Sequence, residues 1–397
     1  MLPYLIDWLS LLGRWLHFIT GIAWIGSSFY FVWLDNHLLP PKRAEAEEEG
    51  VGGEVWSVHG GGFYHAQKYR TAPAALPEPL HWFKWEAYTT WISGMFLLAL
   101  IYWYGAEIYL VDASVTPLSN PVAVAIAIGV LIGTWLVYDL MCKSPLGAND
   151  TLLALGLLAL VSVLAWGLCQ VFSGRGAFIH FGAALGTIMV ANVYRVIIPG
   201  QKQMVAAAAR GEAADPSWGI KGKQRSVHNT YFTLPVLFVM ISHHYAMTYS
   251  TAYSWLILVA ISVAGALIRV YFVARHSGNA SPWPLAAALL LLAAVALALV
   301  PAQGARATAS VSTADVQTIM TNRCTTCHAQ SPTFAAYASA PAGVALEDAV
   351  QIRAAAPRIY EQTVVSRVMP IGNLTKMTED ERAIIDAWYQ SNQWSAN

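Results

Sequence analysis

Charged residues are scarce in this chain of 397 residues. It has 23 basic and 23 acidic residues, which together make up 12% of the chain, against about 25% in a typical soluble domain. So few charges cannot cover the surface of a soluble globule of this length. Neither sign is in excess, so the basic surplus of a nucleic-acid-binding protein is missing. Apolar residues reach 56% and aromatic residues 12%, which excludes a disordered chain and indicates a polytopic membrane protein.

Cysteine is rare as well, and the four residues present are too few for a disulfide scaffold. Cys142 and Cys169 are expected near opposite ends of two membrane spans, too far apart for a disulfide. We therefore predict that these two are packing residues. Cys324 and Cys327 lie three positions apart and belong to a motif.

Long apolar stretches predict about eight membrane-spanning helices, each of about 20 residues. The predicted spans are residues 5–34, 82–104, 121–141, 151–172, 178–199, 229–247, 253–274 and 283–300. The fold class expected from this pattern is all-α, a polytopic membrane helix bundle over residues 1–302.

The loop charges predict the orientation of the bundle. Segments that follow the odd-numbered spans carry eleven Lys and Arg residues, whereas the N-terminus and the other segments carry one, Arg175. Positive loops stay in the cytoplasm, so the N-terminus and everything after the eighth span are expected in the periplasm of a bacterial inner membrane.

The composition changes after the last span. Residues 303–313 are rich in Ala, Ser and Thr and are predicted to be a flexible linker. Residues 314–397 have regularly spaced charges and the length of one small soluble domain. Thr378 and Glu381 are spaced for a capping box at its last helix.

A C-x-x-C-H motif at Cys324, Cys327 and His328 predicts covalent attachment of one haem c. Two thiols one helical turn apart can each form a thioether with a haem vinyl group, and His328 then lies under the iron as its axial ligand. Half of a zinc site is the alternative, but zinc needs four ligands and the sequence has no second Cys pair. We therefore expect a small class I cytochrome c-like helical domain, on the side of the membrane where haem c is assembled.

The second axial ligand is predicted to be Met369, in a loop that contains Pro370 and Gly372. A methionine sulfur there raises the reduction potential. Met377 adjoins the cap of the last helix, and Met320 precedes the motif on the same helix, so both are poorer candidates.

Ionisable residues inside spans are costly and usually functional. Arg14 and His17 are one turn apart on the first span, His180 opens the fifth, and His243 and His244 close the sixth. These residues are expected near the periplasmic half, as a redox or substrate site. Two of the imidazoles could hold a haem b, and the alternative is that they bind water and carbonyls at the interface.

A second cluster is expected on the cytoplasmic side. It combines His59, His65 and Lys68 around three glycines with Lys84 and Glu86 at the mouth of the second span. Glycines permit close approach of the backbone to a ligand, and these side chains suit a planar anion. A flexible loop is the alternative.

Together with the haem motif, several local strings resemble the bacterial membrane-bound urate hydroxylase family, in which a membrane domain is fused to a cytochrome c domain. The matching strings are residues 14–17, 21–30, 58–65, 82–91, 223–229 and 244–245. At His243 the family often carries another polar residue, which makes His244 the stronger candidate.

This resemblance implies that urate is oxidised to 5-hydroxyisourate in purine degradation, with electrons leaving through the haem c to a respiratory-chain acceptor such as a cytochrome c or a terminal oxidase. The chemistry needs a general base and cationic groups for the urate anion. The catalytic residues are not fixed by the resemblance; the candidates are Arg14, His17, His180, His244, His59, His65 and Glu86.

Two other functions fit the same sequence. The chain could be a membrane-anchored electron-transfer subunit that serves a quinol or an oxidase. It could also be a transporter with a fused cytochrome, since polar residues in spans also mark substrate pathways.

Overall fold

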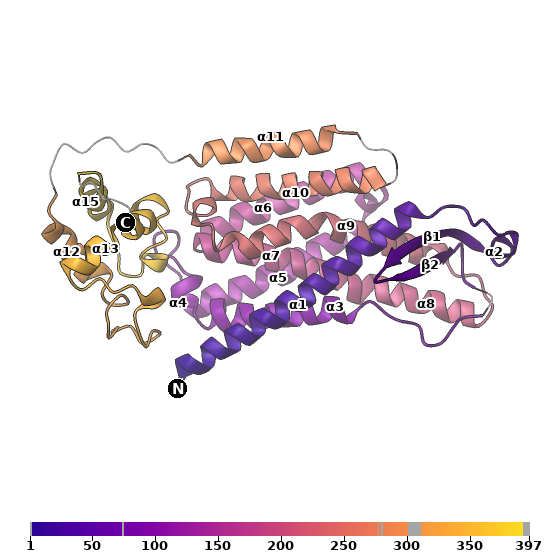
Figure 1. Cartoon of the computed structure of the whole chain (residues 1–397), viewed down its shortest axis with the longest axis horizontal. Helices are drawn as coiled ribbons and strands as arrows, with labels where there is room; N and C mark the ends of the chain where they lie inside the picture. The colour runs from indigo at the N-terminus through magenta and orange to yellow at the C-terminus, as the bar shows by residue number, and fades with distance from the viewer. Residues whose placement is uncertain (1, 74, 277, 279–280, 301–310, 392–397) are drawn as a thin grey trace.

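The structure is a computed structural model that describes residues 2–73, 75–276, 278, 281–300 and 311–391. Most of the predicted linker, residues 303–310, lies outside the described residues. A bundle of long helices carries a small helical domain at one end and a hairpin at the other (Figure 1). The bundle helices are α1 (Leu2–His37), α3 (Trp85–Leu97), α5 (Asn120–Lys143), α6 (Asp150–Val171), α7 (Gly174–Asn192), α8 (Ile198–Ala209), α9 (Pro216–Ser242), α10 (Ser254–His276) and α11 (Trp283–Ala298).

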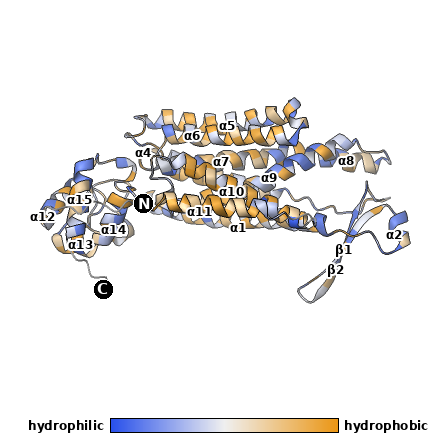
Figure 2. Cartoon of the chain, turned by 90° about the horizontal axis from the view of Figure 1, so that it is seen from above, coloured by the Kyte–Doolittle hydropathy of each residue, from blue (hydrophilic) through white to orange (hydrophobic). Residues whose placement is uncertain are grey.

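Each of the eight predicted spans is helical over most of its length. Within the described residues, five helical stretches are long and apolar enough to cross a membrane: Tyr4–His37, Asn120–Lys143, Asp150–Val171, Gly174–Ala209 and Ser254–Arg275. The apolar helix Trp283–Ala298 is shorter. Membrane crossing by α3, α9 and α11 therefore stays a prediction. Apolar residues dominate the bundle, and polar ones gather at its two ends (Figure 2).

Two helical runs of the bundle contain a wider π-helical turn. The turn η1 (Leu98–Trp103) continues α3, and η3 (Val193–Ile197) joins α7 to α8. Such turns rotate the following side chains and occur frequently at functional sites. A short helix, α4 (Ala106–Tyr109), follows η1 at the end of the bundle that carries the small domain (Figure 1).

Helix starts in the bundle are fixed by side-chain caps. Asn149 accepts a hydrogen bond from the Leu152 amide at 3.0 Å before α6, and Ser173 accepts one from Gly176 at 3.0 Å before α7. These caps satisfy amides that have no partner inside the helix.

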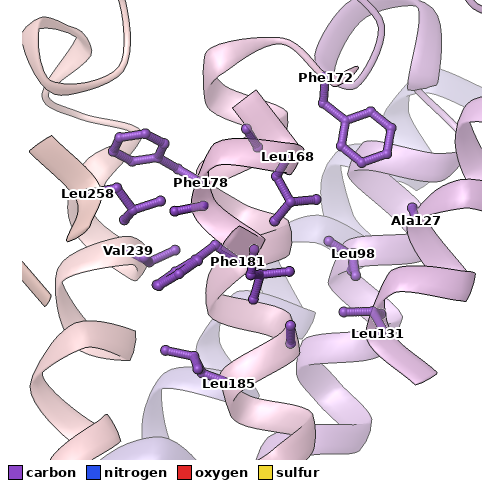
Figure 3. Packing of buried hydrophobic residues seen from close by; sticks show 14 of the residues in the cluster. Leu98, Ala127, Leu131, Leu168, Phe172, Phe178, Phe181, Leu185, Val239 and Leu258 are labelled. Carbon is purple, nitrogen blue, oxygen red and sulfur yellow. The ribbon is translucent and has the colours of Figure 1, made fainter. Parts of the chain in front are cut away.

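Helix α7 lies at the centre of the bundle and supplies much of its core. Phe178 and Phe181 are fully buried, and they pack among residues of the neighbouring helices (Figure 3). Gly182 allows close approach of α9, because a Cβ there would lie 2.6 Å from Val239 Cγ1. Small residues at helix contacts are typical of membrane bundles.

The expectation of an all-α fold is wrong over residues 51–69. Strands β1 (Val51–His59) and β2 (Gly62–Tyr69) form an antiparallel hairpin in which Trp56 faces His65. Gly60 and Gly61 both have positive φ, 58° and 82°, as a two-residue turn of this handedness requires. Gly60 and Gly61 thus form the turn, and Gly62 begins β2. An ordered hairpin forms here instead of a flexible loop.

The small C-terminal domain has its own apolar core, which includes Trp388, Ile385, Met320 and Ile352. Its helices are α12 (Thr313–Arg323), α13 (Ala349–Ala354), α14 (Ala356–Tyr360) and α15 (Glu379–Ser391), with the turns η5 (Pro341–Gly343), η6 (Glu361–Val365) and η7 (Ile371–Asn373). The predicted capping box is confirmed, since Thr378 N–H donates to Glu381 Oε2 at 2.8 Å and Glu381 N–H to Thr378 Oγ1 at 3.2 Å.

Candidate functional site

The C-x-x-C-H motif lies in a pocket of the small domain that also touches the bundle. Cys324 ends α12, and the chain then turns so that His328 N–H donates to Cys324 O at 2.7 Å. The pocket is lined by Ile108, Arg323, Cys324, Cys327, His328, Phe334, Tyr337, Pro341, Met369, Pro370, Ile371, Leu374 and Thr375. The motif and the predicted methionine ligand therefore share one mostly apolar pocket.

The hydrogen bonding of His328 suits an iron ligand. Its Nδ1 lies 2.9 Å from the carbonyl oxygen of Val344, and a carbonyl can only accept, so Nδ1 carries the proton. The unprotonated Nε2 is left for a metal. A backbone carbonyl that fixes the tautomer in this way is the usual support of a ligating histidine.

The two cysteines have the surroundings that a thioether needs. Burial raises the pKa of the Cys324 thiol to about 12 and also raises the pKa of Cys327. An apolar environment disfavours a thiolate, whereas a thioether is uncharged. The pair fits covalent haem attachment better than metal ligation by thiolates.

The three candidate methionines have different positions. Met369 lines the pocket, whereas Met320 and Met377 are 0% and 4% exposed in the domain core. The loop of Met369 is held by Arg382, whose guanidinium donates to the carbonyl oxygens of Met369 at 3.0 Å and of Thr363. Met369 is thus the methionine placed to face a haem in this pocket.

The small domain docks on α4 of the bundle through the Met369 loop. Ile108 of α4 lines the haem pocket, and a Cβ at Gly372 would lie 2.9 Å from the carbonyl oxygen of Val111. Val368 packs against the bundle core. The pocket is therefore separated from the bundle only by the residues of this contact.

His17 and His180 are held by internal hydrogen bonds. His17 Nδ1 lies 2.9 Å from Thr90 O and 3.1 Å from Ser93 Oγ, both on α3. His180 is fully buried; its Nδ1 lies 2.8 Å from Gly176 O, and its Nε2 accepts from Trp103 Nε1–H at 3.2 Å. Both ring nitrogens of His180 are hydrogen-bonded. His180 could therefore bind a haem b iron only if its hydrogen bond with Trp103 were broken.

The histidine pair at the end of α9 behaves differently. The rings of His243 and His244 lie 3.9 Å apart, and His244 is exposed. His243 Nε2 is buried without a hydrogen-bond partner. Arg14 is exposed and bonds Ser10 at 3.2 Å. The residue of the pair with a buried, unpartnered nitrogen is therefore His243, which the sequence ranked below His244.

The predicted cytoplasmic cluster is dispersed. His59 is exposed at the hairpin tip. His65 stacks on Trp56 and bonds Glu54 Oε2 at 2.9 Å. Glu86 lies in the first turn of α3, and its Oε2 is buried without a partner. These side chains belong to different surroundings and do not make one anion site.

A buried polar network was missed in the sequence. The Tyr138 hydroxyl lies 2.8 Å from His228 Nδ1 and accepts from Asn192 at 2.9 Å, and Asn192 also donates to Asn229 at 2.9 Å. Arg225 pairs with Asp139 at 2.9 Å. The available signal was the group of polar residues Arg225, Ser226, His228 and Asn229 before an apolar stretch.

A cavity of about 570 Å³ lies between α1, residues 71–83, the α7–α8 run and α9. Asn229, Thr233 and Ser226 of α9 open into it, together with aromatic residues such as Trp24 and Phe83. No Lys or Arg lines it among the described residues. It lies near the hairpin end of the bundle.

Comparison with known proteins gives one match. Residues 3–300 match the family model described as urate oxidase N-terminal. No curated protein and no solved structure matches the chain. The matched region covers the whole helical bundle and ends before the small domain.

Proposed function

The chain belongs to the urate oxidase N-terminal family, and from this premise we propose that it is a membrane-bound urate hydroxylase. The bundle oxidises urate to 5-hydroxyisourate, and the C-terminal domain is a cytochrome c domain that carries the electrons away. The protein lies in a bacterial inner membrane with the N-terminus and the cytochrome domain in the periplasm, and a respiratory-chain cytochrome c or terminal oxidase is the acceptor.

The reaction balances with water as the oxygen source. One urate monoanion and one water give one 5-hydroxyisourate, one proton and two electrons. The bundle must therefore bind an anion, accept a proton and release two electrons in succession. A haem c bound in the pocket would supply a one-electron acceptor.

The residues that line the pocket support this cofactor. Cys324 and Cys327 would carry the thioethers, and His328 and Met369 would bind the iron. Val344 fixes the tautomer of His328, and Arg382 holds the Met369 loop. The observation that carries the proposal is the position of this pocket against α4, because it brings a one-electron site directly to a bundle of the urate oxidase family.

The test is to add urate to the purified, oxidised full-length protein without oxygen and to follow the haem absorbance. We expect one haem to be reduced per protein, and an added oxidised cytochrome c to allow continued conversion to 5-hydroxyisourate. A His328→Ala protein that lacks haem and still oxidises urate at the normal rate would refute the proposal.

One observation favours a second function. The 570 Å³ cavity is lined by aromatic and aliphatic side chains together with neutral polar ones, and its described lining has no Lys or Arg, which suits a neutral planar molecule such as a quinol. A quinol-linked electron-transfer subunit would show haem reduction by a quinol and none by urate. Urate uptake into vesicles without haem reduction would instead indicate a transporter.

A further inference from the structure

Arg175 is a half-buried cation at the start of α7, at the end of the bundle that faces the cytochrome domain. Its Nε donates to the Tyr102 hydroxyl at 3.2 Å, and its guanidinium lies 5.0 Å from the centre of the Tyr109 ring. Within the described residues, no carboxylate lies in ion-pair distance of it. A partly buried charge without a counter-charge is costly, and a bound anion would offset that cost.

The wider turn η1 presents aromatic groups to this cation. Tyr102 belongs to η1 and Tyr109 to α4, and their ring centres are 6.0 Å apart. Tyr249, which is also buried, interacts with Arg175 from the α9–α10 connection. A guanidinium group beside aromatic rings suits a flat anion. The guanidinium can donate to two acceptor oxygens of the anion, and an aromatic ring can stack on the plane of the anion.

Two further groups approach from other helices. Arg14 of α1 and Arg175 both lie within electrostatic range of Tyr102 and of His243. His243 has a hydrogen bond with the backbone of Met240, and its buried Nε2 has no hydrogen-bond partner. Tyr249 connects His243 to Arg175, because its hydroxyl donates to the His243 carbonyl oxygen at 3.5 Å and a Cβ at Gly174, next to Arg175, would overlap the Tyr249 carbonyl oxygen.

This place adjoins the haem pocket. Tyr337, which lines the pocket with Cys327 and His328, interacts with the Tyr109 hydroxyl and lies within electrostatic range of Arg175. An oxidisable molecule held by Arg175 would therefore be separated from the proposed haem pocket by the side chains of Tyr109 and Tyr337.

The larger cavity is less suited to an anion that gives up electrons. Its described lining has no Lys or Arg and includes Asp35. It reaches the far end of α7, at Met189 and Val193. Met189 and Val193 follow Arg175 by 14 and 18 residues along this helical run, so they are about 21 and 27 Å from it at 1.5 Å per residue.

We propose that Arg175, Tyr102, Tyr109 and His243 form the site that binds the urate anion for oxidation. This inference rests on the proposed function and specifies its location. Arg175 holds the anionic oxygens, the Tyr109 ring packs on the purine plane, and His243 Nε2 takes the one proton released when water adds to the urate monoanion. The two electrons leave one at a time through the adjoining haem pocket.

The experiment measures equilibrium binding of urate to the full-length protein after its haem has been chemically reduced without oxygen, so that no turnover occurs. Arg175→Gln is expected to weaken binding about 10- to 100-fold, because a charged hydrogen bond and the main counter-charge are lost. Arg175→Lys keeps the charge and should recover part of the affinity. Arg195→Gln is the matched control, since Arg195 lies over Trp135 at the other end of the same helical run and should leave binding unchanged.

Comparison of urate with a neutral purine distinguishes a role of Arg175 in anion binding from a purely structural role. The wild type should prefer urate to hypoxanthine, and Arg175→Gln should lose this preference while its haem spectrum and melting temperature stay normal. Normal urate binding by a folded Arg175→Gln protein would overturn the inference. So would a loss of binding in Gln201→Met, at the lining of the large cavity, with none in Arg175→Gln.

The two proposals fail separately. If urate reduces the wild-type haem but Arg175 variants bind urate normally, the site is wrong and the function stands. If urate binds through Arg175 but never reduces the haem, the site is an anion site and the urate hydroxylase function is wrong.

Discussion

The histidines of this protein differ in which of their ring nitrogens have a hydrogen-bond partner. His328 and His180 each have Nδ1 tied to a backbone carbonyl, at 2.9 and 2.8 Å. Nε2 of His180 is already bonded to Trp103, whereas Nε2 of His243 has no partner. The ring of His180 is thus fully hydrogen-bonded inside the protein, whereas His243 keeps one ring nitrogen available for chemistry.

Replacement of the loop methionine tests the axial ligand. In Met369→Ala the haem should stay covalently attached, the sulfur-to-iron charge-transfer band should disappear, and the reduction potential should fall, because a thioether ligand favours ferrous iron. Absorbance and redox titration measure both effects.

Met377→Leu is the matched control for the axial ligand. Met377 is 4% exposed in the domain core, so this volume-conserving change should cost less than about 1.5 kcal/mol and keep the band. A Met369→Ala protein with an unchanged band would show that another group binds the iron.

Acid should weaken the anchoring of the hairpin through Glu54. The hydrogen bond from Lys42 N–H, at 3.1 Å, and the contact with His65 lower the pKa of Glu54 below its ordinary value of 4.5, although burial acts the other way. A lowered pKa contributes stability that is present above pH 4.5 and is lost as the pH falls through the folded value. Hydrogen-exchange protection of residues 38–56 should therefore drop in that range.

Glu54→Gln provides the comparison for this pH effect. It should show reduced protection of the same residues already at pH 7 and no further loss between pH 5 and about 3 that is assignable to this site. Equal pH dependence in the two proteins would show that Glu54 does not anchor the hairpin.

Helix α4 and the turn η7 form the contact through which the small C-terminal domain meets the bundle. The four residues of α4 begin three residues after the π-helical turn that supplies Tyr102 and Trp103. The same short segment therefore positions the proposed anion site on one side and lines the proposed haem pocket on the other. This arrangement connects the two domains through one short segment of the chain, from η1 to α4.

A methyl group at Gly372 should loosen this contact. Gly372 has a φ of 57° and its Cβ position lies 2.9 Å from Val111 O, whereas Gly343 has a φ of 68° and open space around it. Both changes to Ala carry the backbone penalty of about 1–2 kcal/mol. Only Gly372→Ala should also lose hydrogen-exchange protection over residues 105–118, and equal behaviour of the two variants would contradict the docking.

At the scale of the whole molecule, the chain is polarised along the bundle. The N-terminus and the small C-terminal domain lie at one end, and the hairpin and the outer part of α8 lie at the other (Figures 1 and 2). The loop charges predict that these two ends lie on opposite sides of a membrane.

Chemical labelling tests this arrangement in cells. Single cysteines at His59→Cys, on the exposed hairpin tip, and at Val350→Cys, 78% exposed in the cytochrome domain, are compared in a Cys142→Ser, Cys169→Ser background. In intact spheroplasts a membrane-impermeant maleimide should label Val350→Cys alone, and His59→Cys should react after lysis. Labelling of both without lysis would contradict the topology.

The sequence predicts elements well where one physical signal dominates. The eight apolar stretches form helices, and the spacing of Thr378 and Glu381 forms the capping box. The hairpin was missed because alternation in strands of eight and nine residues is a weak signal beside three glycines. The haem motif is recognisable from spacing alone, since two thiols and an imidazole must meet one flat cofactor.

The sequence by itself determined a helical membrane-type chain with a C-x-x-C-H domain, because charge scarcity, apolar length and motif spacing are local properties. Only the tertiary structure decided which polar groups meet. Arg175 and Tyr102 come from separate helical segments, and their hydrogen bond depends on the π-helical turn and on packing around α7. The approach of α4 to the haem pocket likewise depends on docking between segments more than 200 residues apart, and no local pattern encodes such a contact.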